Sequence, residues 1–398
     1  MIKHSKEMGR AEKQALAAMF GLFGFGVMTL GPRMPDIKYN LGVSNGIFGM
    51  LLSSGSIGAL VSLLTMGHIV HRIGVKSVLL VSTFTMYGTL AIMVHLHNPF
   101  IYLILNLLCG ASWSSYHIAV NAQAFHRQKD SGQTIIPFMH GFWTAGALGS
   151  AIVASLVAQT IPITWHVDTL VTVDFIVTMF VIYLLRDVLL QGREITDSDG
   201  VVTLKDMAKS FKIDWFISIA VLCSQTLETM LGDWGSIFAR EEIGVNASLA
   251  VLPYIFFMGG MIFGRISFGS LSKHWSEQWL IRIFPLVGGL TFAIFMYTGY
   301  LISKNHQLLG FVIVDFAFLV GGVGISFLGP LFLAIAGRRS DRPSGVIVAE
   351  IGALNQILNF AVRILLAWTI HIIGLPMMLV IPALMLAAVT FFAAAGKA

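Results

Sequence analysis

The sequence predicts an all-α membrane protein whose twelve transmembrane helices form two six-helix bundles. Three observations predict it: an apolar composition, twelve long apolar runs and one polar segment near the middle. Of the 398 residues, 56% are hydrophobic and only 11% are charged, whereas soluble domains carry about 25% charged residues. The chain therefore cannot cover itself with a polar surface, and a lipid bilayer suits it.

The individual helices are predicted from the apolar runs. A bilayer crossing needs roughly 20 mostly apolar residues. Runs of this kind between turn signals occur at 14–36, 46–68, 77–97, 99–124, 134–160, 166–187, 213–239, 247–271, 279–302, 306–334, 344–371 and 375–395. The long polar connection predicts an N-terminal bundle at 1–187, a cytoplasmic linker at 188–212 and a C-terminal bundle at 213–398.

The Lys and Arg residues predict the orientation, because cytoplasmic segments of membrane proteins carry an excess of them. With the N-terminus inside, 19 of the 25 fall in cytoplasmic segments, 4 fall outside, and Arg265 and Arg363 lie within helices. We therefore expect both termini in the cytoplasm. The N-terminal apolar run lacks a clear cleavage site, so we expect it to be a retained first helix.

The two halves resemble each other around their second helices. Gly58 and Gly67 lead into the basic turn GHIVHRIGVKS, and Gly260 and Gly269 lead into the basic turn GSLSKHWSEQW. A parallel repeat is expected when two six-helix halves are related by an axis along the membrane normal.

The turn GHIVHRIGVKS resembles the loop 2–3 signature of the major facilitator superfamily, roughly G-x-x-x-D-R-x-G-x-K. Gly67, Arg72, Gly74 and Lys76 match this signature, whereas His71 occupies its acidic position. The resemblance covers essentially the whole chain. It implies the major facilitator superfamily fold, in which helices 1, 4, 7 and 10 line a central cavity and the two halves rock around it.

Two further segments, NAQAFHRQKDSGQTIIPFMHGFWTAGALGSA and LETMLGDWGSIFARE, resemble the branch near the fucose:proton symporters and related bacterial inner-membrane permeases. The fifth helix lacks the Gly-Pro element typical of drug:proton antiporters. The resemblance therefore implies a transporter of the bacterial inner membrane and favours uptake over efflux.

Glu228 and Asp233 lie within the predicted seventh helix, in the stretch SQTLETMLGDWGSIFARE. A charge at the bilayer centre costs on the order of 3 kcal/mol on insertion scales, so such residues usually face a cavity or a partner. No basic residue is expected at the depth of Glu228, and an unpaired carboxyl away from water can bind and release a proton. We therefore expect Glu228 to couple transport to protons, with a substrate hydrogen bond or a structural role as the alternatives.

An outer ionic cluster is predicted from helix depth. Asp233, Asp315 and Arg363 each lie roughly 7–9 Å further towards the outside than Glu228. A structural ion pair is the preferred interpretation for Asp233 with Arg363, because pairing is the usual state of buried charges.

Two further positions are expected to be ion pairs or gates. Arg265 and Glu350 each lie about two turns from the cytoplasmic end and are expected to pair, either as an inner gate or as a permanent brace. Arg33 and Asp36 flank Pro35 where the first helix reaches the outside. For these two residues a solvated helix end is preferred to an outer gate.

The first half contributes a polar stripe. Trp113, His117 and Asn121 are spaced by four and share one helix face, and His140 on the fifth helix should lie at a depth similar to His117. Such groups suit a solute with hydroxyl or amide groups or a ring. The residues expected to bind the solute are Trp113, His117, Asn121, His140, Gln225 and Glu228. His117 and His140 are second candidates for proton binding, and packing or interhelical hydrogen bonds are the alternatives for the stripe.

Several classes of function are not supported by the sequence. There is no phosphate-binding G-x-x-x-x-G-K-[ST] motif and no convincing hydrolytic nucleophile, so neither ATP drive nor an enzyme is expected. The loop histidine pairs lack the carboxylate or Cys neighbours of a metal site. We expect no cofactor, no metal and, because the basic residues form no stripe, no nucleic acid. The expected partners are the bilayer, protons and a small solute, bound by a monomer.

The sequence thus predicts a secondary transporter that moves a small polar, sugar-like solute by alternating access with proton symport. A proton-coupled efflux antiporter for amphipathic compounds would share this architecture. A membrane receptor that binds a solute without moving it is the other alternative.

Overall fold

The computed structural model describes residues 8–132, 135–192, 214–339 and 344–397. These residues form an all-helical molecule, and ten of the described helical spans are long and apolar enough to cross a membrane. The predicted linker lies mostly outside the described residues. At its described start, the Gln123 side chain holds the chain by hydrogen bonds of 2.9 Å to Val188 O and Leu190 N.

The first half contains the helices up to Leu185. Its first crossing is broken by Pro32 and Pro35 near its end into a helix, a short turn and a second short helix. The elements are α1 (Arg10–Met28), η1 (Gly31–Arg33), α2 (Met34–Leu41), α3 (Asn45–Met93), α4 (Pro99–Ser131), α5 (Ile136–Val157) and α6 (Ile163–Leu185).

The second half contains the remaining helices. The seventh crossing ends in a short π-helical turn, and the tenth crossing is divided between two helices. The elements are α8 (Trp215–Ile237), η4 (Phe238–Ile243), η5 (Leu249–Val251), α9 (Leu252–His274), α10 (Glu277–Ser303), α11 (Gln307–Ile325), α12 (Leu328–Arg338), α13 (Ser344–Ala388) and η6 (Val389–Lys397).

Two of the ten spans each contain two of the twelve predicted helices. The α3 span has 49 residues and α13 has 45, each more than twice the roughly 20 residues that one crossing needs. Each span is interrupted by a glycine with φ of +80°, Gly74 in α3 and Gly374 in α13. A positive φ is open to glycine without steric cost, so the chain can leave the helix at these points. Divided there, the ten described spans correspond to the twelve predicted crossings.

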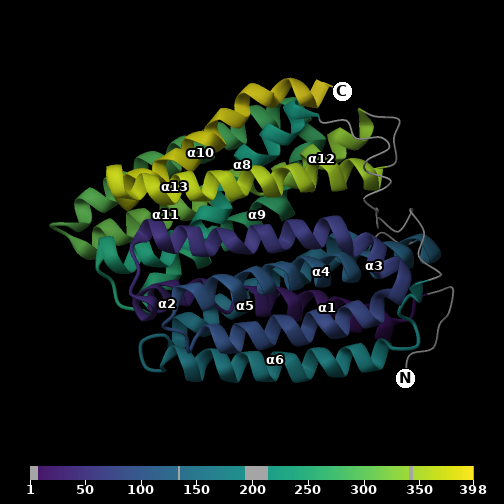
Figure 1. Ribbon diagram of the computed structural model, residues 1–398. Helices are drawn as coiled ribbons and strands as arrows, with labels where there is room; N and C mark the ends of the chain where they lie inside the picture. Colours follow the sequence, from purple (N-terminus) through teal and green to yellow (C-terminus); the bar gives the residue numbers. More distant parts are fainter. Residues whose placement is uncertain (1–7, 133–134, 193–213, 340–343, 398) are drawn as a thin grey trace.

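The two halves lie side by side, with the helices of each half running roughly along one direction (Figure 1). The α1–α6 half is purple to teal, and the α8–α13 half runs from blue-green to yellow. The α1 helix begins and η6 ends at the same end of the molecule, to the right in the figure. We name this end the predicted inner end. The opposite end, which carries residues 29–44, 94–98 and 238–251, is named the predicted outer end.

Equivalent glycines bring two helices together within each half. A side chain at Gly58 of α3 would collide with the α4 backbone at Leu107, and a side chain at Gly260 of α9 would collide with the α11 backbone at Leu319. Small residues of this kind permit close approach of membrane helices. The same glycine in each repeat therefore packs its half's second crossing against the fourth.

Candidate functional site

Two histidines of the first half face each other. The rings of His117 on α4 and His140 on α5 have centroids 6.0 Å apart. Phe23 of α1 lies 6.0 Å from His117, and Phe20 lies 5.5 Å from His140. His117 is exposed, whereas Tyr116 beside it is fully buried. The predicted polar stripe of α4 is thus turned away from the core of its bundle.

Arg265 of α9 connects these histidines to the second half. Its Nη1 donates a hydrogen bond of 3.1 Å to Thr144 Oγ1 on α5, and its Nε donates one of 2.9 Å to Ser326 O. The positive charge of Arg265 also interacts electrostatically with the His140 ring and with the Glu228 carboxyl of α8. We call His117, His140, Thr144, Glu228 and Arg265 the central cluster, because it brings both halves to one site.

The central cluster corrects two expectations. Glu228 was expected to lack a basic neighbour, but the long Arg265 side chain, which starts about two turns from the helix end, acts on it. The expected permanent brace between Arg265 and Glu350 is wrong, since Arg265 donates its hydrogen bonds to Thr144 and Ser326 instead. The inner gate, in which this pair breaks when the cavity opens inward, stays a prediction. Glu350 is buried on α13. Depth along a helix therefore did not identify the partner of Arg265.

The other predicted solute-binding residues lie around the cluster with different surroundings. Asn121 Nδ2 donates a hydrogen bond of 2.8 Å to His117 O on its own helix. Gln225 is exposed on α8, near Gly329 of α12. Trp113 is half-buried, and its Nε1 has no hydrogen-bond partner among the described residues. Of the six, the structure brings His117, His140 and Glu228 into the central cluster, and the roles of all six stay predictions.

The predicted outer ionic cluster forms only in part. Asp233 Oδ2 and Arg363 Nη2 lie 2.6 Å apart, and Arg363 Nη1 donates a hydrogen bond of 3.2 Å to Ser56 Oγ in the first half. Asp315 does not join them: its Oδ1 is buried without a hydrogen-bond partner in the described part of the chain. The prediction used only the depth of each residue along its helix. Depth does not determine which face of the helix carries Asp315, and Asp315 does not contact Arg363.

Two ion pairs join the halves at the predicted outer end. Asp36 Oδ1 lies 2.7 Å from Arg240 Nη1, and Lys38 Nζ lies 2.6 Å from Glu241 Oε2. We call these two pairs the outer closure. They connect α2 to η4, so they must separate before the halves can move apart at this end.

Arg33 is a buried residue that pairs with Asp36 of the outer closure. It is only 3% exposed, its Nε lies 2.6 Å from Asp36 Oδ2, and its Nη1 donates a hydrogen bond of 3.1 Å to Ile161 O. The solvated helix end expected for Arg33 is therefore wrong. Burial of Arg33 fixes Asp36, which in turn holds Arg240 of the other half.

One buried ion pair joins α1 to α4 at a position that the apolar pattern does not indicate. Arg127 of α4 makes a bidentate pair with Glu12 of α1, with Nε–Oε1 at 2.5 Å and Nη2–Oε2 at 3.0 Å. The exposed fractions of the two side chains are 0% and 3%. The apolar run that ends at 124 predicts a loop at Arg127, whereas α4 continues to Ser131. The i, i+3 spacing of Arg127 and Asp130 was the available sign of a longer helix.

The loop 2–3 signature has a structural role at Gly74. A side chain there would lie 3.0 Å from both Leu190 O and Gly192 N, and Val75 N donates a hydrogen bond of 3.0 Å to Leu190 O. His71, at the position of the signature's acid, has a buried Nε2 without a hydrogen-bond partner among the described residues. Gly74 therefore joins the turn to the described start of the linker, while Arg72 is exposed.

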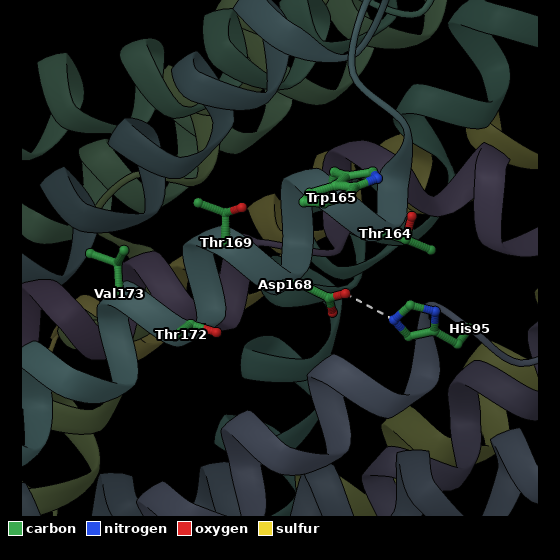
Figure 2. A pocket seen from close by; sticks show the side chains of 7 residues that line it. All are labelled: His95, Thr164, Trp165, Asp168, Thr169, Thr172 and Val173. Carbon is green, nitrogen blue, oxygen red and sulfur yellow. Dashed lines mark hydrogen bonds and ion pairs between the residues drawn. The ribbon is translucent and has the colours of Figure 1, made fainter.

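A separate pocket lies at the predicted outer end, away from the central cluster. It has a volume of about 570 Å³ and is lined by His95, Thr164, Trp165, Asp168, Thr169, Thr172 and Val173. Figure 2 shows His95 reaching towards Asp168 of α6, and His95 Nε2 lies 2.9 Å from Asp168 Oδ2. None of the predicted solute-binding residues lines this pocket. Within the described ranges, no group of three His, Cys, Asp or Glu side chains could hold a metal ion.

The helices and the cluster shared by both bundles define a multi-pass membrane protein with a polar site between two halves. The family model described as Major Facilitator Superfamily matches residues 16–349. The chain therefore belongs to this superfamily, whose members are transporters and not enzymes.

Similar proteins agree with this membership. An uncharacterised MFS-type transporter of Yersinia pestis is 25% identical, with 87% of this chain and 86% of the relative covered. An uncharacterised transporter of Sinorhizobium fredii is 26% identical, with 85% of each chain covered. The finer placement near the fucose:proton symporters stays a prediction.

Solved structures share the fold. A mutant of the nucleoside transporter NupG has a TM-score of 0.72 at 14% identity, with 97% of this chain and 100% of that chain covered. A D-xylose–proton symporter also has a TM-score of 0.72 at 14% identity, with 96% and 97% covered. At this identity the likeness concerns the fold alone.

Proposed function

We propose that this chain is a proton-coupled symporter that carries a small polar organic solute, sugar-like or nucleoside-like, across the bacterial inner membrane. It works as a monomer by alternating access, with both termini in the cytoplasm. The observation that carries the proposal is Arg265, which donates a hydrogen bond to Thr144 of the other half while its charge acts on Glu228.

The central cluster offers the contacts that such a solute needs. Imidazole rings at His117 and His140 provide hydrogen-bonding nitrogens, and Phe20 and Phe23 provide ring faces beside them. Binding sites for small molecules combine apolar walls with a few placed polar groups in this way. Because the contacts come from both halves, a bound solute would bridge them.

Proton coupling is assigned to Glu228 and Arg265. An ionised Glu228 attracts the guanidinium group, and this attraction is strong where water is scarce. A proton on Glu228 removes the attraction, so Arg265 is then held by Thr144, by Ser326 O or by the solute. Proton binding and solute binding would thus act on the same side chain.

The structural neighbours support the solute class. Their names include a D-xylose–proton symporter and a nucleoside transporter, and these share the fold over nearly the whole chain. Sugars and nucleosides carry the hydroxyl groups that histidine and arginine side chains recognise.

A ligand screen tests the solute class. Purified protein is heated with sugars, nucleosides, amino acids or amphipathic drugs, and a ligand of the native state raises the apparent stability. A stabilising sugar or nucleoside is then added to proteoliposomes under an imposed pH gradient. Accumulation driven by the gradient supports symport. Stabilisation only by amphipathic drugs with efflux would favour the antiporter, and stabilisation without flux would favour the receptor.

Glu228→Gln is expected to abolish gradient-driven accumulation of the solute found in this screen. Glutamine keeps the shape and hydrogen bonding of a protonated Glu228 but cannot release a proton. Equilibrium exchange of the solute across the liposome membrane should be retained. The control is Glu277→Gln, which changes a partly exposed carboxyl of the same half and should leave accumulation unchanged. Normal accumulation by Glu228→Gln would contradict the coupling role.

A further inference from the structure

A second carboxyl is enclosed in the first half, away from the central cluster. Asp174 lies near the middle of α6 and is only 3% exposed. Neither Oδ1 nor Oδ2 has a hydrogen-bond partner among the described residues. The neighbouring Tyr87 hydroxyl interacts with this carboxyl, but one neutral hydroxyl compensates a buried carboxylate only in part for the loss of water.

The surroundings of Asp174 come from α1, α3 and α4. A methyl group at Gly26 of α1 would lie 3.0 Å from both Asp174 Oδ2 and the Tyr87 hydroxyl oxygen. The Tyr87 hydroxyl is 3.4 Å from Thr178 Oγ1, one turn further along α6. Tyr116 of α4, which precedes His117 of the central cluster, interacts electrostatically with Asp174.

No basic group balances the carboxyl among the described residues of this enclosure. The titratable groups that face it are the hydroxyls of Tyr87 and Tyr116. His166 and Asp168 lie on the same helix but about two turns nearer the predicted outer end, and His166 is beside Arg33 there. An uncompensated buried charge is far more costly than the neutral acid, so Asp174 holds a proton while it is enclosed.

The end of α1 that lies over Asp174, at Gly26, continues into residues that contact the second half. Met28, two residues after Gly26, accepts at its Sδ a hydrogen bond of 3.2 Å from the Tyr254 hydroxyl of the second half. Gly31 O accepts one of 3.2 Å from Ser236 Oγ, also of the second half. Separation of the halves at the predicted outer end therefore releases the segment of α1 that encloses the carboxyl.

We propose that Asp174 is a second proton-binding site, in the first half, which is closed off by α1 and exchanges its proton when the predicted outer end opens. The proposal rests on the alternating access of the proposed function, but not on the identity of the solute. It differs from the coupling assigned to Glu228, because Asp174 lies in the other half and outside the central cluster.

Infrared spectroscopy of the purified full chain tests this proposal without any solute. At neutral pH the difference spectrum of the wild type minus Asp174→Asn should contain the C=O band of one protonated carboxyl, because asparagine matches the neutral acid in shape but has no carboxyl group; bands from Glu228 or Asp315 cancel in this difference. Asp315→Asn is the control and should leave this band in place. Absence of the band from this difference spectrum would mean that Asp174 is an ionised carboxylate and would overturn the proposal.

The rate of proton–deuteron exchange at Asp174, measured by the shift of this C=O band in D₂O, tests whether opening of the predicted outer end exposes the carboxyl. Gly49→Trp forces α3 and α13 apart at the predicted outer end, since a side chain at Gly49 collides with Ala367. The exchange should be about tenfold faster in Gly49→Trp than in the wild type, and an equal rate would overturn the proposal.

If Asp174→Asn does not fold, Gly26→Ala identifies the Asp174 band, because the added methyl group touches the carboxyl and should shift the frequency of the band. Gly88→Ala, with open space around it, should not shift it.

Discussion

Arg127→Met is expected to destabilise the folded chain by about 3–5 kcal/mol, because it leaves the Glu12 carboxylate buried without its guanidinium partner. The pair holds α1 against α4 with two hydrogen bonds, and both side chains are almost completely buried. The measurement is denaturant unfolding of the purified protein in detergent, followed by the change in helix content.

A double variant separates the ion pair from the packing around it. Arg127→Met combined with Glu12→Leu removes both charges and should recover most of the lost stability, since apolar replacement of a whole buried pair is often neutral. The matched control is Arg338→Met, which breaks the ion pair between Arg338 and Glu277. The Arg338 side chain is 46% exposed. It should cost less than about 1 kcal/mol. Equal effects of Arg127→Met and Arg338→Met would contradict the argument.

The helices were predictable from the sequence because burial in lipid demands long apolar runs. Each predicted run has a helical counterpart in the described residues. The ends were less predictable. α4 extends to Ser131 because its last two turns carry polar residues that pack against other helices, and apolar length gives no signal for such turns. The reversals at Gly74 and Gly374 depend on backbone conformation, which a hydrophobic pattern does not record.

The side chains of the site were predictable only as candidates. Spacing by four placed His117 on a polar face of α4, and the structure brings it to His140. The partners of the charged residues were not predictable, because they depend on how the two halves meet. Arg265 reaches Thr144 across that interface, and Arg33 is buried under the outer closure. Rise along a helix gives a level in the membrane but no direction around the helix axis, and this explains the misplacement of Asp315.

Gly49→Trp is expected to hold the predicted outer end open and to abolish transport. Gly49 of α3 lies directly against Ala367 of α13, and a side chain there would also lie 3.4 Å from the ring of Trp234. Phe48 beside it packs edge to face on the same ring at 5.9 Å. The closed arrangement thus leaves no room for an indole at position 49, whereas separation of the halves creates that room. Occupation of the interface by the indole shifts the equilibrium towards the open form.

Labelling of a single cysteine on α8, three residues before Glu228 of the central cluster, measures this shift without a known solute. Cys109 and Cys223 are replaced by alanine, Gln225→Cys is introduced, and intact cells are treated with a membrane-impermeant maleimide. Gly49→Trp should raise the labelling rate about tenfold. Gly88→Trp, on an exposed face of the same span with no neighbouring atoms, should leave the rate unchanged. Faster labelling in inverted vesicles instead of intact cells would reverse the predicted orientation. Unchanged labelling from both sides would show that the contact at Gly49 does not control access.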